Sequence, residues 1–179
     1  ADDASHDSPR PWFGLEVPNA DASEVDRLGE ELGCRPAVMS RFVKLDGNLQ
    51  VADLHRMAQG ARTPLLTLEP WSWQSRPGEI QPRFSLQSII EGRHDQELWR
   101  IGSIIAEYGG PVMVRFAHEM NANWYPWGMG VNGNTPGRYV AAWDHVHGLI
   151  EKTGVDVSWV WSPVAAWWDD TVPLRELYP

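Results

Sequence analysis

Residues 95–116, DQELWRIGSIIAEYGGPVMVRF, contain one complete structural unit of the chain. Apolar residues recur at spacings of three and four from Leu98 to Tyr108, which predicts an amphipathic helix over 95–108. The pair of glycines that follows is a helix-ending signal. The apolar run at 112–116 is typical of a strand that is buried on both faces. This stretch therefore predicts a helix, a tight turn and a strand in succession.

The same alternation of strand and helix continues on both sides of this unit. Strands are predicted at Trp12–Val17, Ala37–Val43, Pro64–Leu68 and Val157–Trp161, and helices at 21–33, 49–59 and 135–154. A further helical segment is expected at 171–178, and 71–82 is expected to be a loop. Alternating elements with strands this apolar indicate a parallel sheet covered by helices, with the strands side by side in sequence order.

Two architectures fit this alternation, the open doubly wound sheet and the (β/α)8 barrel. A doubly wound nucleotide-binding fold has a glycine loop directly after its first strand, but residues 16–19 contain no glycine. The only G-x-G-x-x-G pattern, at 128–133, follows aromatic residues rather than a strand and is interpreted as a loop. We therefore expect a (β/α)8 barrel of the TIM type. It is incomplete, with about five βα units where a whole barrel needs about 250 residues.

Composition excludes several classes of protein. Hydrophobic residues make up 42% of the chain and charged residues 22%, which is typical of a globular protein. The net charge of −9 argues against nucleic acid and anionic membranes as partners. The single cysteine, Cys34, can form neither an internal disulfide nor a thiolate metal site. Residues 1–11 are predicted to be a flexible tail, as left by removal of a signal peptide or by trimming, and 12–179 to be the barrel domain.

The carboxyl ends of the predicted strands carry acids and aromatic residues. Catalytic residues of a barrel lie at these ends, so we expect one rim to gather them. The rim residues are Glu16, Glu69, His118, Glu119 and Ser162, with Trp71, Trp124 and Trp161 lining the same concavity. The chain has 11 tryptophans, and their flat apolar rings suit the faces of sugars.

His118-Glu119 is the pair with the clearest chemical interpretation. A zinc protease would need a second histidine four residues after His118, but that position is Ala122, and no metal site is expected. A glycosidase acid/base is a carboxyl group that apolar surroundings keep protonated, and Glu119 is flanked by aromatic residues. The alternative is that Glu119 forms an ion pair with Arg115 or Arg41.

The run Arg115–Trp127, RFAHEMNANWYPW, resembles the strand-four motif of glycoside hydrolase family 26. Looser similarity extends to Leu68–Trp71 and Trp159–Pro163, so that the resemblance covers residues 12–179. The family contains β-mannanases, mixed-linkage β-glucanases and some β-1,3-xylanases. The resemblance implies a (β/α)8 barrel that retains anomeric configuration by means of two glutamates.

The resemblance also assigns roles to individual residues. It implies that Glu119 is the acid/base, that His118 orients groups near the reactive sugar, and that Trp124 is the aromatic floor beside the cleaved bond. Arg115 matches a charged residue beneath the active site. Further contacts with substrate are expected from Trp71, Trp127, Trp161 and Glu69, whereas Trp143 and Trp159 are expected to pack in the interior.

The second glutamate of the family, the nucleophile, lies on strand seven, which is expected to be outside this chain. The chain is then a fragment completed by a second chain or segment, or a truncated relative. A substitute nucleophile could be Glu16, Glu69, Asp169 or Asp170, and nothing in the sequence selects among them.

The leading hypothesis is a secreted retaining endo-β-glycanase that needs no cofactor. β-1,4-Mannan is the first choice of substrate, a mixed-linkage β-1,3/1,4-glucan the second, and an exopolysaccharide the third. The rival hypothesis is a fragment that binds carbohydrate without turnover or is inert.

Overall fold

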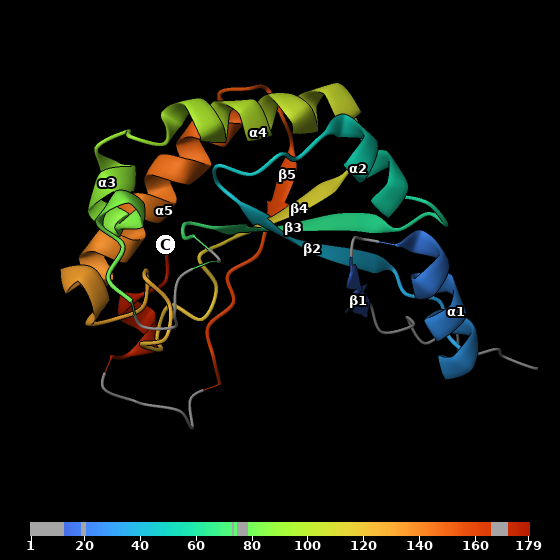
Figure 1. Ribbon diagram of the computed structural model, residues 1–179, viewed down its shortest axis with the longest axis horizontal. Coiled ribbons are helices and arrows are strands. Elements are labelled where there is room, and N and C mark those ends of the chain that lie inside the picture. Colours follow the sequence, from blue (N-terminus) through green and yellow to red (C-terminus); the bar gives the residue numbers. More distant parts are fainter. Residues whose placement is uncertain (1–12, 19–20, 73, 75–78, 166–171) are drawn as a thin grey trace, which may run out of the picture.

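The computed structural model describes residues 13–18, 21–72, 74, 79–165 and 172–179. They form one sheet of parallel strands in which sequence neighbours are also neighbours in space (Figure 1). The strands are β1 (Gly14–Glu16), β2 (Val38–Lys44), β3 (Thr63–Glu69), β4 (Val112–Phe116) and β5 (Val157–Trp159). The predicted parallel sheet in sequence order is confirmed.

The strand boundaries follow the apolar runs of the sequence. β4 coincides with its prediction, because its apolar run is bounded by glycine and proline on one side. β5 ends at Trp159, earlier than the predicted Trp161. The chain still runs beside β4 after that point, since the amide of Val160 donates to the carbonyl oxygen of Val114 at 2.8 Å.

Five α-helices connect or flank the strands. They are α1 (Ala22–Leu32), α2 (Val51–Met57), α3 (Leu86–Ile90), α4 (Asp95–Tyr108) and α5 (Pro136–Glu151), with 3-10 turns η2 (Pro82–Phe84), η3 (Val131–Gly133) and η4 (Leu174–Glu176). The prediction for α4 is confirmed over its whole range. The helix expected near the end of the chain is, in its described part, only the short turn η4, and α3 was not predicted.

The ends of the longer helices have local causes. The Asp21 carboxylate accepts from the amide of Ser23 and begins α1, and Gly33 ends it with φ 66°, a left-handed conformation that glycine adopts without strain. Thr135 caps α5 by accepting from the amide of Arg138, with Pro136 in the first turn. These caps lie at the bounds of the helices that the sequence predicted at 21–33 and 135–154.

The helices cover one face of the curved sheet (Figure 1). Leu66, Leu68 and Val114 are fully buried within the apolar core. Arg41 forms an ion pair with Asp53 of α2 at 2.7 Å, and Trp159 packs on Trp143 of α5 with ring centroids 5.7 Å apart. Alternate residues of each strand therefore point into the helical layer.

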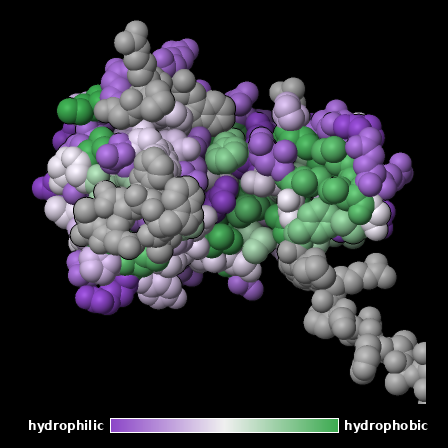
Figure 2. Space-filling view, turned by 90° about the horizontal axis from the view of Figure 1, so that it is seen from below, coloured by the Kyte–Doolittle hydropathy of each residue, from purple (hydrophilic) through white to green (hydrophobic). Residues whose placement is uncertain are grey.

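The remaining residues of the strands point to the concave face of the sheet. There they line a cavity of about 410 Å³, whose walls include Glu16, Ser40, Leu65, Met113 and Arg115. Figure 2 views the molecule from below and shows apolar surface on this side. In a (β/α)8 barrel this face is the interior of the barrel, filled by layers of side chains. The described strands thus form an arc of such a barrel.

None of the described helices is both long and apolar enough to cross a bilayer.

Two adjacent leucines on β3 test this division of the sheet into two faces. Leu66→Ala should lower the free energy of unfolding by about 2–5 kcal/mol, because it empties a fully packed site in the core. Leu65→Ala should cost about 1 kcal/mol, because that side chain lines the concave cavity. Urea denaturation of both variants measures the difference. Equal losses would contradict an open concave face.

Candidate active site

The loops after β3, β4 and β5 meet at the carboxyl edge of the sheet. The amide of Ala117 donates to the carbonyl oxygen of Leu68 at 3.1 Å, and the amide of Glu119 donates to that of Ser162 at 2.7 Å. Glu69 is the last residue of β3. These contacts bring Glu69, Glu119 and Ser162 to one rim, as the strand order predicts. Glu16 ends β1 at the far side of the same rim.

Glu119 is held by its backbone and by its side chain. Its φ is 55°, in the left-handed region that non-glycine residues rarely adopt, and Ala117 has φ 45°. Its Oε2 accepts from the indole nitrogen of Trp124 at 3.0 Å. Backbone strain of this kind concentrates at functional sites, where the surrounding structure enforces it. The geometry therefore directs the Glu119 carboxylate toward the ring of Trp124.

Of the two arginines that were alternative partners of Glu119, Arg41 is engaged elsewhere, whereas Arg115 interacts with Glu119 through its charge. Arg41 pairs with Asp53 on the helical side of the sheet. The Arg115 Nε atom donates to the Thr67 hydroxyl at 2.9 Å. Burial lowers the pKa of Arg115, while attraction to Glu119 and Glu69 opposes that shift. Arg115 therefore lies beneath the rim as a cation between two carboxylates.

His118 is buried among aromatic rings directly before Glu119. Its ring centroid lies 4.9 Å from Tyr125, 5.5 Å from Phe42 and 5.7 Å from Trp127. Burial, together with the positive charge of Arg115, lowers the pKa of His118 to about 4. The imidazole is therefore neutral at neutral pH and can donate or accept a hydrogen bond without adding a positive charge to the site. Its buried Nδ1 atom has no partner among the described residues.

Tyr125 and Trp127 form the centre of an aromatic cluster. Their rings stack with centroids 4.4 Å apart, and Trp71 meets them edge-on at 5.5 and 6.2 Å. Trp127 is 0% exposed and donates its indole N–H to the carbonyl oxygen of His118 at 2.6 Å. Trp127 thus packs beneath the site and stabilises it. A side chain without exposed surface cannot stack on a sugar, so the expected role of Trp127 as a sugar platform does not fit the structure. Trp71 and Trp124 remain partly exposed.

Glu69 is connected to this cluster. The carboxyl group is almost wholly buried, with the residue 4% exposed, and Oε2 accepts from the Trp71 indole nitrogen at 3.2 Å. Burial raises the pKa of Tyr125, and the charges of Glu119 and Glu69 add to that rise. Sequence reasoning gave Tyr125 no role of its own, although it lies inside the motif directly after Trp124.

Three further tryptophans, Trp143, Trp159 and Trp161, were assigned roles from the sequence. Trp143 and Trp159 pack on each other in the helical layer, as predicted. Trp161 is partly buried and meets Tyr178 edge-on, with ring centroids 5.4 Å apart. Its expected contact with sugar stays a prediction. Two of the proposed substitute nucleophiles, Asp169 and Asp170, lie outside the described residues.

The glycine-rich stretch is a loop, as predicted, and not a nucleotide-binding turn. Gly130 and Gly133 have φ values of 77° and 68°. Gly128 passes so close to the preceding loop that a Cβ atom would lie 2.2 Å from the carbonyl oxygen of Ala122. The amide of Met129 donates to the carbonyl oxygens of Met120 and Ala122, both at 3.0 Å. The glycines therefore let the chain fold back behind Trp127.

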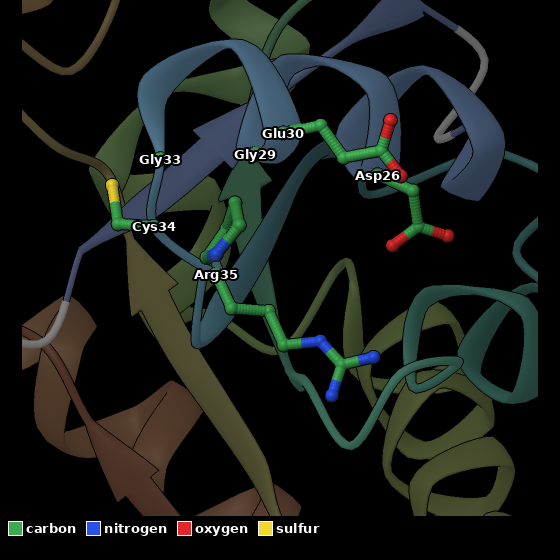
Figure 3. Close-up of a pocket in the computed structure, with 7 residues that line it drawn as sticks. Asp26, Gly29, Glu30, Gly33, Cys34 and Arg35 are labelled. Atoms are coloured by element: carbon green, nitrogen blue, oxygen red, sulfur yellow. The ribbon is translucent and has the colours of Figure 1, made fainter.

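A second cavity, of about 530 Å³, lies where α1 ends and the chain enters β2 (Figure 3). Its lining comprises Asp26, Gly29, Glu30, Gly33, Cys34, Arg35 and Pro36. This is the amino end of the strands, where a barrel keeps residues that serve stability rather than chemistry. Among the described residues, no group of three His, Cys, Asp or Glu side chains could hold a metal ion.

Part of the chain is similar to a known family of proteins. Residues 98–179, which include β4, its loop and β5, match the model of Glycosyl hydrolase family 26. The resemblance to family 26 is confirmed. Endoglucanase H of Acetivibrio thermocellus is 29% identical over 101 residues, which are 55% of this chain and 10% of that protein.

Solved structures show the same fold. The catalytic domain of a Bacillus sp. JAMB-750 GH26 endo-beta-1,4-mannanase aligns with a TM-score of 0.67 at 19% identity, over 95% of this chain and 54% of that one. The GH26 domain of a Prevotella bryantii endo-beta-mannanase/endo-beta-glucanase aligns with a TM-score of 0.70 at 14% identity, over 94% and 63%. The fold is thus that of a (β/α)8 barrel, and the chain spans little more than half of these relatives.

Gly128 offers a test of the loop behind the site. Gly128→Ala should cost about 1–3 kcal/mol of stability and weaken the near-ultraviolet circular dichroism of the aromatic cluster, because the new methyl group collides with backbone. Gly148→Ala in α5 is the matched control, since its Cβ meets no atom within 4 Å. It should leave the spectrum unchanged and stabilise the helix by up to about 1 kcal/mol. An unaltered spectrum for Gly128→Ala would contradict the close approach.

His118 should give stability a distinct dependence on pH. Its pKa of about 4 in the folded state lies below the ordinary 6.5, so the unfolded state binds more protons between these values. The wild type should therefore lose roughly 3 kcal/mol relative to His118→Gln as pH falls from 7 to 4, and little more below that. Urea denaturation at each pH measures this difference. A constant difference would contradict a neutral buried imidazole.

Proposed function

We propose that this chain provides the acid/base half of a retaining endo-β-glycanase. The observation that carries the proposal is the carboxyl group of Glu119, hydrogen bonded by Trp124 and placed beside a buried neutral His118. The match to family 26 and the similarity to Endoglucanase H support a hydrolase that acts on a β-glycan. Because the chain covers only part of these relatives, the activity of the whole protein belongs to the proposal.

In the first chemical step, Glu119 donates its proton to the glycosidic oxygen while a second carboxylate attacks the anomeric carbon. The bond between that carbon and the leaving oxygen breaks, and a covalent glycosyl ester forms. In the second step the Glu119 carboxylate accepts a proton from water, which attacks the anomeric carbon and releases the nucleophile. The anomeric configuration is inverted twice and so retained. No cofactor is required.

The nucleophile is expected from an additional segment. In a retaining enzyme the two carboxyl groups lie about 5–5.5 Å apart, on either side of the reactive sugar. Such a segment would have to cover the concave face, where the cavity beneath the rim lies. We therefore propose that further strands, in the same protein or in a second chain, complete the barrel and carry the second glutamate.

The surroundings of Glu119 suit a polymeric substrate. Trp124 and Trp71 offer partly exposed rings at the rim, and flat rings of this kind stack on sugars. β-1,4-Mannan is the preferred substrate, because the aligned enzymes include one described as an endo-beta-1,4-mannanase. A mixed-linkage β-1,3/1,4-glucan is the second choice and an exopolysaccharide the third. Polysaccharides are too large to cross a cell membrane unaided, so we propose that the protein is secreted.

The competing function is binding of carbohydrate without turnover. The same aromatic rings would serve both functions. The left-handed backbone of Glu119 and its bond to Trp124 favour catalysis, since a binding platform has no need of a strained carboxylate.

Glu119→Ala should separate the two functions. In the enzyme, hydrolysis of substrates with poor leaving groups should fall by about 10²–10⁴, because proton donation is lost. Activated aryl glycosides need little protonation, so the first step should suffer much less. Added azide needs no deprotonation, so it should restore turnover and yield a β-glycosyl azide. Kinetics with paired substrates and analysis of the product measure both effects.

Glu107→Ala, on the exposed side of α4, is the matched control and should leave both substrates unaffected. Equal losses for good and poor leaving groups in Glu119→Ala, without rescue by azide, would overturn the assignment. Binding of oligosaccharide by a wild-type protein that never turns it over would favour the rival function.

A further inference from the structure

The hydrogen bonding between β4 and β5 continues beyond the two strands. Within the sheet, Val114 pairs with Trp159, and the amide of Val160 donates to the carbonyl oxygen of Val114 at 2.8 Å. Past the end of β4, the amide of Glu119 donates to the carbonyl oxygen of Ser162 at 2.7 Å. The two segments therefore stay side by side through the residue that bears the acid/base carboxyl.

The side chain of Asn121 makes the last hydrogen bonds between these two segments. The Nδ2 atom of Asn121 donates to the carbonyl oxygen of Val164 at 3.0 Å, and its Oδ1 accepts from the amide of the same residue at 2.8 Å. Asn121 is 7% exposed, so both bonds are shielded from water. The amide group thus takes the place of a backbone peptide and binds Val164 as a strand residue would.

Glu119 needs such a restraint. Its φ is 55° and that of Ala117 is 45°, and a strained backbone of this kind persists only where neighbours enforce it. Glu119 has one backbone bond to the β5 side, and the next bonds on that side are those of Asn121. Without them the strained turn would be free to relax.

We propose that Asn121 is a positioning residue that fixes the Glu119 carboxyl group by locking the loop after β4 to the chain after β5. Asn121 does not touch the reacting atoms in this role. It acts by keeping Glu119 in its left-handed conformation, with Oε2 within reach of the Trp124 indole. The inference rests on the proposed function, because Glu119 is taken as the acid/base.

The first experiment needs no activity. The indole N–H of Trp124 reports on the position of Glu119, because it donates to Oε2. Its signal in a ¹⁵N–¹H spectrum, assigned with Trp124→Phe, should shift or broaden in Asn121→Ala. Ser88→Ala is the matched control. It removes a buried hydroxyl that donates to the carbonyl oxygens of Arg83 and Ser85 in the η2 and α3 region, and it should leave the Trp124 signal in place.

The second experiment uses the active enzyme. Asn121→Ala should slow hydrolysis of poor leaving groups by about 10²-fold, the cost of a misplacement of about 1 Å, and that of activated aryl glycosides much less. Asn121→Asp keeps the acceptor, but its ionised form places a second oxygen against the Val164 carbonyl. Protonation restores a donor, so its defect relative to the wild type should shrink as pH falls. The defect of Asn121→Ala should not.

Three results would overturn the inference. One is an unchanged Trp124 signal in Asn121→Ala. Another is a loss of activity in Asn121→Ala that is equal for good and poor leaving groups. The third is a defect of Asn121→Asp that does not depend on pH. If Glu119→Ala itself shows no dependence on the leaving group, the proposed function fails, and the Trp124 signal still decides whether Asn121 positions Glu119.

Discussion

The parallel register of β3, β4 and β5 is the constraint on which the candidate site depends. Parallel strands end at a common edge, so the loop after β4 must pass between Glu69 and the chain after β5. The same register pairs Thr67 with Arg115 and places their side chains on the concave face. A slip of one residue would turn Arg115 into the apolar helical layer and Phe116 out of it. Burial of the apolar strand residues therefore determines which polar side chains lie at the rim.

Charge is arranged on this framework with one cation for two carboxylates. Burial lowers the pKa of both Arg115 and His118, but only His118 loses its charge at neutral pH. The pKa of Arg115 starts so far above neutrality that it stays charged, whereas that of His118 falls to about 4 and the imidazole is neutral. Arg115, a half-buried cation that Glu119 attracts, is thus one that Glu69 also attracts. This balance keeps a neutral hydrogen-bonding group directly beside the proposed acid.

Local patterns made the framework predictable, but not the surroundings of the site. α4 and β4 follow from apolar periodicity and the glycines between them, because each is decided by residues within a few positions. α3 has only five residues, too few for a helical period to show. The roles of Glu119 and His118 rested on resemblance to a family. Trp127 was expected to contact sugar but is buried, because side chains in a loop follow no period and their exposure is set by distant contacts.

The layers on the concave face connect the fold to the function. Leu65 and Met113 pair in one layer, Thr67 and Arg115 in the next, and Glu69 lies above them at the rim. On β3 and β4 the lower pair is thus apolar and the pair under the acid is polar. Arg115 uses its Nε atom on Thr67 and has further N–H donors in its guanidinium. Strands that complete the barrel must then offer apolar side chains opposite Leu65 and hydrogen-bond acceptors opposite Arg115, since unpaired donors enclosed in a barrel would be costly. A nucleophilic glutamate one layer higher would be stabilised as a carboxylate by that same arginine.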